Sequence, residues 1–376
     1  MFSIFADKRS RQSPALKWVA LWRYILGPCA FTWKAACRFL FRGPNAQSLD
    51  CEVQNQQHQQ QSKTGRAEHP RQLTYVPIPG PWRREEKPNW PESAFCVPAD
   101  VPDDTIYYIT KGRWIGEGDT AHIELLPSGH VVKYPKSNPY CRKEEEENRN
   151  RVRLEAEVYK RLKHSPYIPR FIDWEPGSCC LTLEHLENGS LEAYARKHVE
   201  VTADDRVLNH VPMEVRTRWA VQAAKAIADV HAVQVVHCDV TPRNFLLSAE
   251  LDLRVSDFAG CSISGSSPLI APGARYQPPG WNWKLKALEE HDLFALGSVL
   301  YFIMVGIELY ADLEEDEAED LFRGGEFPPV DHLPCAGVIQ GCWNMTYSSA
   351  HQVVHALNGL GWEAYSKQCS LRPCDS

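Results

Sequence analysis

Apolar and polar positions along residues 105–186 follow the pattern of short strands around one long helix. Runs of β-branched and aromatic residues predict strands at 105–109, 130–134 and 181–186. Residues 142–163 have the charge pattern of a single helix, with an apolar stripe at Leu154, Val158, Tyr159 and Leu162. A small strand-rich unit with one long helix is therefore expected.

A second, mainly helical unit is predicted after residue 187. Residues 187–191, Glu-Asn-Gly-Ser-Leu, have the composition of a turn followed by a helix start. Apolar residues then recur at the spacing of a buried helix: Trp219, Ala220, Ala223, Ala224, Ile227 and Val230. Together the two patterns predict an α+β fold with an N-lobe at about 105–183 and a larger, mainly α-helical C-lobe at about 187–357.

Residues 1–52 are basic and apolar, unlike the rest of the chain. Within 15–42, Lys34, Arg38 and Arg42 recur every four residues, which places them on one face of a helix. Charges interrupt the apolar run too often for the roughly 20 apolar residues of a bilayer-spanning helix. A basic amphipathic helix in peripheral membrane contact, or a targeting segment, therefore stands beside two plainer alternatives, a docked surface helix and a poorly ordered tail.

Residues 53–100 are expected to connect this segment to the folded body. The run QNQQHQQQ cannot bury a core, and proline-rich sequence from Pro77 to Pro98 is typical of an extended connector. Residues 358–376 carry no motif and are expected to be a tail.

Charge and cysteine content narrow the class of protein. A net charge of −7 argues against a dedicated nucleic-acid binder, which needs a basic surface to meet phosphates. Residues 1–49 carry +7 and the remainder −14, so the two parts are expected to do different jobs. Thirteen scattered cysteines without a CxxC predict reduced thiols, mostly buried, in a cytoplasmic compartment.

Gly116 and Gly118 lie in the run IGEGDTAHIELL, at 115–126, where a strand-turn-strand could bring backbone N–H groups against phosphate oxygens. A GxG in a hairpin is more often only a turn. The usual third glycine of the phosphate-binding pattern is Ala121 here, so this signal is weak by itself.

Lys133 follows in an apolar strand, where a lysine is costly unless an anion receives it. Glu155 and Glu157 of the charged helix are the candidates to meet it. We prefer Glu155 because the phrase Lys160 to His164 sets the register of the helix end.

Two segments in the second half place acids and an amide at fixed spacing. VVHCDVTPRNFLL, at 235–247, puts Asp239 and Asn244 on a loop before an apolar run, and LRVSDFAG, at 253–260, adds Asp257. With the glycine loop and the lysine strand, these segments resemble the protein-kinase signature set, with HCD for HRD and DFAG for DFG. The amino-acid sequences of these segments resemble those of small divergent Ser/Thr kinase-like proteins of filamentous fungi.

Further segments agree with this resemblance in order and spacing over residues 105–357. They are the hinge-like EHLENGSL at 184–191, RYQPPG at 275–280 where an APE-type ending belongs, and DLFALGSVLYFIMVG at 292–306. Asp292 is implied to be the buried aspartate that steadies the backbone of the catalytic loop.

The resemblance implies a bilobal kinase fold and phosphoryl transfer from ATP, with Mg²⁺, to Ser/Thr hydroxyls of a protein substrate. The implied ATP-binding residues are Ile115, Gly116, Glu117, Gly118, Lys133, Glu155, Glu184 and Leu186. Asn244 and Asp257 are implied to be the magnesium ligands, because Mg²⁺ takes hard oxygen donors. The implied catalytic residues are Asp239 as the proton acceptor, Thr241 at the position of the family's lysine, and Arg243 as the substitute cation.

Departures from the family pattern keep other classes open. Cys238 replaces an arginine that in many kinases receives an activation-loop phosphate, and Gly280 replaces the glutamate that ends the activation segment. The arginine that pairs with this glutamate is also absent after Cys342-Trp343, which avoids an unpaired buried charge. The alternatives are a pseudokinase or nucleotide-binding scaffold, and a small-molecule phosphotransferase, which the hinge and RYQPPG segments disfavour.

Overall fold

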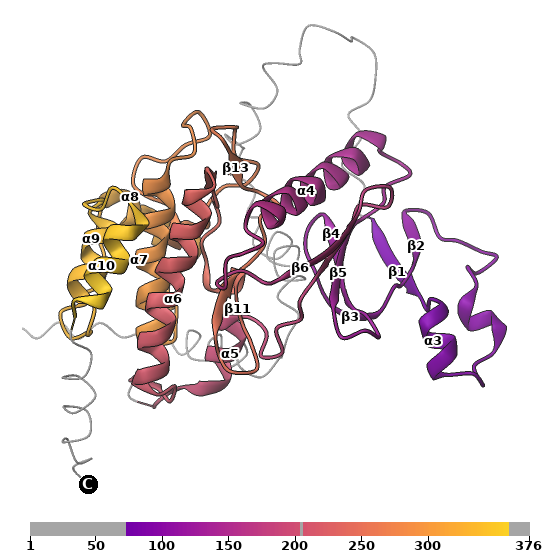
Figure 1. Ribbon diagram of the computed structural model, residues 1–376, viewed down its shortest axis with the longest axis horizontal. Helices are drawn as coiled ribbons and strands as arrows, with labels where there is room; N and C mark the ends of the chain where they lie inside the picture. The colour runs from indigo at the N-terminus through magenta and orange to yellow at the C-terminus, as the bar shows by residue number, and fades with distance from the viewer. Residues whose placement is uncertain (1–72, 204–205, 361–376) are drawn as a thin grey trace, which may run out of the picture. The chain divides into compact units, whose positions relative to one another are not determined.

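The computed structural model describes residues 73–203 and 206–360, which form a strand-rich lobe and a helical lobe (Figure 1). The elements of the N-lobe are β1 (Thr74–Ile78), α3 (Pro81–Glu86), η1 (Glu92–Phe95), β2 (Thr105–Ile109), β3 (Arg113–Glu117), β4 (Ala121–Leu125), β5 (Val131–Pro135), α4 (Arg142–Arg161), β6 (Phe171–Glu175) and β7 (Cys180–Leu183). Those of the C-lobe are α5 (Leu191–His198), β8 (Val199–Val201), β9 (Val207–Asn209), α6 (Met213–Ala232), β10 (Val235–Val236), η2 (Pro242–Asn244), β11 (Phe245–Leu247), β12 (Leu253–Val255), β13 (Ser262–Ile263), η3 (Ala274–Tyr276), α7 (Glu289–Val305), α8 (Glu315–Gly324), α9 (Ala336–Trp343) and α10 (Ala350–Asn358). The predicted α+β bilobal fold is confirmed.

The N-lobe is built on an antiparallel five-stranded sheet with the order β3-β4-β5-β7-β6. Its middle strand, β5, carries Lys133, which pairs with Ile123 of β4 and Leu181 of β7. Helix α4 packs against β5, β6 and β7. Because Val152, Glu155 and Tyr159 recur at helical spacing and are buried, Glu155 lies on the helix face that meets the sheet.

Part of the range expected to be a connector has regular structure. Strand β1 pairs in parallel with β2, with Thr74 opposite Thr105 and Ile78 opposite Ile109. The sequence TYVPI has the β-branched and aromatic residues of a strand, and Ile78 is buried. Pro77 is tolerated because β1 is an edge strand of a two-stranded sheet.

His122 on β4 joins this small sheet to the large one. Its imidazole stacks on the ring of Tyr108 of β2, with 3.9 Å between the ring centroids. The centroids of the Tyr75 ring of β1 and the Tyr134 ring of β5 lie 5.5 Å and 5.3 Å from that of the imidazole. Burial, and then the ammonium of Lys136, lower the pKa of His122 to about 4. The ring is therefore neutral at pH 7 and costly to protonate inside the fold.

We expect the free energy of unfolding to fall as the pH drops from 7 to 5, because in this range the unfolded His122 binds a proton and the folded one does not. From the lowered pKa, His122 contributes about 1–2 kcal/mol to this loss. Urea unfolding at both pH values measures it. His122→Phe, which keeps an aromatic ring, should show a correspondingly smaller difference between the two pH values, and an unchanged difference would contradict the assignment.

The C-lobe core is formed by α6 and α7, against which α9 and α10 pack. Leu293, Phe294, Leu296 and Val299 of α7 are buried, and Asp292 is buried with them at the start of this helix. Beside these helices, β11 pairs with β12 and β10 pairs with β13. These two pairings bring the loop after β10 next to the loop after β12.

The expectations for membrane-spanning helices, for the two ends of the chain and for the cysteines are compared with the structure in turn. Within residues 73–203 and 206–360, no helix is long and apolar enough to cross a bilayer. The predicted basic helix at 15–42 and most of the tail at 358–376 lie outside these residues. Every cysteine in the described part of the chain is a free thiol.

Candidate active site

Lys133 lies between two carboxylates that come from distant parts of the chain. Its Nζ is 2.7 Å from Oε2 of Glu155 on α4 and 2.7 Å from Oδ1 of Asp257, which follows β12. The side chains of Lys133 and Glu155 are 9% and 1% exposed, whereas that of Asp257 is 47% exposed. The cluster is therefore buried on the side of α4 and open to solvent at Asp257.

The two carboxylates keep Lys133 charged despite its burial. Burial lowers the pKa of Lys133, but Asp257 and Glu155 raise it more, and the net shift is upward. Burial raises the pKa of Asp257, but the Lys133 ammonium outweighs it and holds this pKa below its usual value. For Glu155 burial prevails, and its pKa is raised. An ammonium in this position can meet an anion that enters from the open side.

The loop of residues 237–244, which the resemblance implied to be the catalytic loop, folds back on Asp239, and Asp239 is buried. Arg243 donates from Nη2 to both carboxylate oxygens of Asp239, at 3.1 and 3.0 Å. Asn244 donates from Nδ2 to the Asp239 carbonyl and to its Oδ2, each at 2.8 Å. The turn η2 begins with Pro242, whose fixed φ suits the first position of a helical turn and brings these two side chains back to residue 239.

Asp292 holds the backbone of this loop, as the resemblance implied. Its carboxylate accepts hydrogen bonds from the backbone N–H groups of His237, at 2.7 Å, and Cys238, at 2.9 Å. Its Oδ2 also lies 2.9 Å from Nε2 of His231 on α6. Burial raises the pKa of Asp292, but His231 outweighs burial and the net pKa is lowered. An ionised acceptor thus sits under Cys238, whose φ is +66°.

Ser256, the residue before Asp257, connects the segment of Asp257 to that of Asn244. The backbone N–H and the hydroxyl of Ser256 both donate to the carbonyl of Asn244, at 2.8 and 3.1 Å. Next to Asp257, Phe258 is buried against His237, at 5.1 Å, and Tyr159, at 5.3 Å. Packing of this ring inward leaves the Asp257 carboxylate directed at Lys133.

The glycine loop connects β3 and β4, and the residues in it leave space. A Cβ added to Gly116 or Gly118 would have no atom within 4 Å among the described residues. Ile115 is 38% exposed on the same strand. Glu117 forms an ion pair with Lys136 at 3.3 Å, so its side chain holds the loop to the residue that follows β5. Packing alone does not require glycine at these positions.

The hinge predicted to meet adenine follows β7. The carboxylate of Glu184 forms an ion pair with Arg254 of β12 and accepts the backbone N–H of Arg170 at 2.9 Å. Within the described residues, no hydrogen bond to the backbone N–H of Leu186 is found. Glu184 thus has a structural use for its side chain, and backbone groups are what the hinge can offer to a ligand.

Thr241 lies two residues after Asp239, at the position where the resemblance implied a lysine. Its side chain is buried, and within the described residues its hydroxyl has no hydrogen-bond partner. The sequence did not point to two further residues of the site, His231 and Arg254. His231 cannot be recognised from the sequence because it lies on the apolar face of α6. Arg254 cannot be recognised because it lies in a strand of only three residues.

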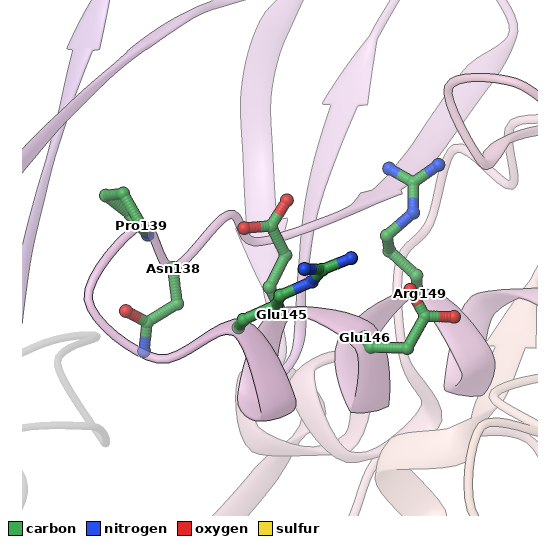
Figure 2. A pocket seen from close by; sticks show the side chains of 6 residues that line it. Asn138, Pro139, Glu145, Glu146 and Arg149 are labelled. Atoms are coloured by element: carbon green, nitrogen blue, oxygen red, sulfur yellow. The ribbon is translucent and has the colours of Figure 1, made fainter.

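A surface hollow at the start of α4 is separate from this cluster. Figure 2 shows Glu145, Glu146 and Arg149 on the helix and Asn138 and Pro139 on the loop before it. Acids and bases are mixed there, and none of the residues implied to bind ATP or metal lines it.

The protein kinase domain model matches residues 109–332, more than half of the chain. The protein therefore belongs to the protein kinase family. A mitogen-activated protein kinase kinase kinase 7-like protein of Drosophila melanogaster is 31% identical over 143 residues, or 37% of this chain and 34% of that protein. The serine/threonine-protein kinase plk-1 of Caenorhabditis elegans is 24% identical over 268 residues, or 69% of this chain and 39% of that protein.

Aurora kinase of Schizosaccharomyces pombe is 26% identical over 171 residues, or 44% of this chain and 45% of that protein. The chain thus spans less than half the length of each of these relatives. The match to the domain model, residues 109–332, extends over the two lobes described above.

Proposed function

We propose that this protein transfers a phosphoryl group from ATP, in a Mg²⁺-dependent reaction, to Ser/Thr hydroxyls of a protein substrate. One observation carries the proposal. The charged Lys133 lies 2.7 Å from both Glu155 and Asp257, and the Asp257 carboxylate is open to solvent, which supports a role for Lys133 at the nucleotide and for Asp257 at the metal. Phosphoryl transfer depends mainly on such positioning and on neutralising charge.

The N-lobe residues are suited to hold the nucleotide. Lys133 would neutralise the α- and β-phosphates, and the backbone from Ile115 to Gly118, Glu117 included, would cover them. Open space around the two glycines supports this role. The backbone groups of Glu184 and Leu186 would bind adenine at the hinge.

Asp257 and Asn244 fit a magnesium ion chemically, because both present hard oxygen donors and the Asp257 carboxylate is ionised and half exposed. The bound ion would supply charge neutralisation at the phosphates. In this proposal Lys133 orients Asp257, and the Ser256 contacts keep Asn244 beside it.

Asp239 would accept the proton of the attacking hydroxyl. Arg243 holds its carboxylate from one side, and because this guanidinium is 58% exposed it can also face a transferring phosphate. Arg243 then takes over the charge of the missing lysine, and the hydroxyl of Thr241 is a neutral donor at that lysine's position. The preference for Ser/Thr rests on the similarity to the serine/threonine-protein kinase plk-1.

The second candidate is a pseudokinase or nucleotide-binding scaffold, favoured by the altered residues Ala121, Cys238, Thr241 and Gly280. We also propose, for either candidate, that the protein is cytoplasmic, that residues 15–42 make peripheral membrane contact, and that the chain is related to kinase-like proteins of fungi. Free thiols in the described part of the chain support the first of these.

The proposal is tested by incubating the full chain with γ-labelled ATP and casein, with and without MgCl₂. We expect Mg²⁺-dependent label on phosphoserine and phosphothreonine after acid hydrolysis. Asp257→Asn should remove most of it, because the metal loses its charged ligand. No transfer by the wild type, while ATP still raises its melting temperature, would replace the proposal by the scaffold.

A further inference from the structure

The end of the activation segment, residues 274–280, has no acidic side chain that could tie it to the helical lobe. Gly280 is exposed and has a φ of +78°. Near the place where the family has its pairing arginine, the indole of Trp343 donates to Ser298 Oγ at 3.2 Å and stacks on Phe327 at 4.8 Å. Other contacts must therefore hold this end of the segment.

Arg275 of η3 provides three such contacts to one loop. Its Nε donates to the carbonyl of Leu309 at 2.8 Å, and its Nη2 donates to the carbonyls of Tyr310 and Leu313 at 3.0 and 2.6 Å. All three acceptors lie in the loop between α7 and α8, and η3 packs on both helices. A planar guanidinium with several N–H donors can hold such a loop, whereas an ammonium on a flexible stem cannot make the same set of bonds.

The next residue, Tyr276, faces the interior. It is buried, and its hydroxyl donates to Oε1 of Glu308 at 2.9 Å. Burial, and then Glu308, raise the pKa of Tyr276, so the phenol remains a donor. The positive charge of Arg243 offsets part of this rise.

We propose that Arg275 is a positioning residue that anchors the end of the activation segment to the loop between α7 and α8, and so holds the surface on which the protein substrate lies. The role in substrate binding rests on the proposed function. The anchor takes the place of the ion pair that Gly280 and the missing late arginine cannot form. Arg275 does not contact the residues that bind ATP, so its effect should be confined to the protein substrate.

The test compares Arg275→Ala and Arg275→Lys with Arg323→Ala, a matched control. Arg323 is an exposed arginine on α8 whose partners are Glu319 and Asp320. Two measurements are made on the full chain: hydrogen–deuterium exchange of residues 266–280, and KM values for casein and for ATP. The melting temperature checks folding, and Arg275→Lys, which keeps the positive charge on a single donor nitrogen, is used if the alanine variant does not fold.

For Arg275→Ala we expect faster exchange in 266–280 and a KM for casein raised about tenfold, because the variant loses all three hydrogen bonds to the loop between α7 and α8. Exchange in 235–247 and the KM for ATP should stay unchanged, as should all values for Arg323→Ala. Unchanged exchange in 266–280, or an equal rise in the KM for ATP, would overturn the anchor. Wild type without transfer would refute the proposed function instead, and exchange would still decide on the anchor.

Discussion

Asp239→Asn is expected to lower kcat for phosphoryl transfer by about 10²–10⁴-fold, because the amide cannot accept the proton of the substrate hydroxyl. The substitution keeps the shape of the side chain, and Asn244 can still donate to the backbone carbonyl of residue 239. In the proposed function ATP is bound by Lys133 and the hinge and not by Asp239, so the rise in melting temperature with ATP should persist. Steady-state kinetics with casein and a thermal shift titration measure the two effects.

Asp100→Asn serves as the control for this substitution, because Asp100 is an exposed carboxylate on a loop before β2. It should leave kcat unchanged. If Asp239→Asn retained wild-type kcat, Asp239 would not be the proton acceptor, and transfer would depend on positioning by the phosphate-binding residues alone.

The sequence predicted the lysine–glutamate contact because the register set by the helix end at Lys160 to His164 favoured Glu155 over Glu157. Glu155 shares a face with Val152 and Tyr159 and meets Lys133, whereas Glu157 points away and pairs with Arg161. Helical periodicity predicted α6, whose buried face follows the expected spacing. Such local rules extend to the catalytic loop because its residues are within a few positions of one another.

Contacts between distant segments could not be predicted in this way. The parallel pairing of β1 with β2 joins segments on either side of a proline-rich stretch, whose composition indicated only a connector. His231 and Arg254 act through partners about 60 or more residues away, at Asp292 and Glu184. Nothing in their own neighbourhood in sequence distinguishes them from other residues of a helix or strand.

Backbone geometry at the site depends on the same distant contacts. Cys238 and Asp257 both have φ of +66°, a conformation that costs non-glycine residues energy. Asp292 offsets this cost at Cys238 by accepting its N–H, and the buried ring of Phe258 fixes the turn after Asp257. The arrangement of acids in the site thus depends on a helix, α7, that contributes no residue to nucleotide binding in the proposal.

Asp292→Ala is therefore expected to have the largest effect on stability, lowering the free energy of unfolding by about 3–5 kcal/mol. The substitution leaves the backbone N–H groups of His237 and Cys238, and the side chain of His231, buried without their acceptor. Asp292→Asn keeps one acceptor oxygen and should lose less. Urea unfolding at pH 7 measures the free energy of unfolding of both variants. The phosphoryl-transfer activity should also fall, because the loop around Asp239 becomes less ordered.

The pH dependence of the free energy of unfolding shows how much of the effect of Asp292 is due to its charge and how much to the shape of its side chain. Because its folded pKa lies below the ordinary value of 3.8, the carboxylate adds stability above that pH and loses it as the pH falls through the folded pKa. Asp292→Asn lacks this contribution, so its stability should converge on that of the wild type in acid. A constant difference between the two proteins from pH 7 down to pH 3 would show that Asp292 acts as a neutral acceptor.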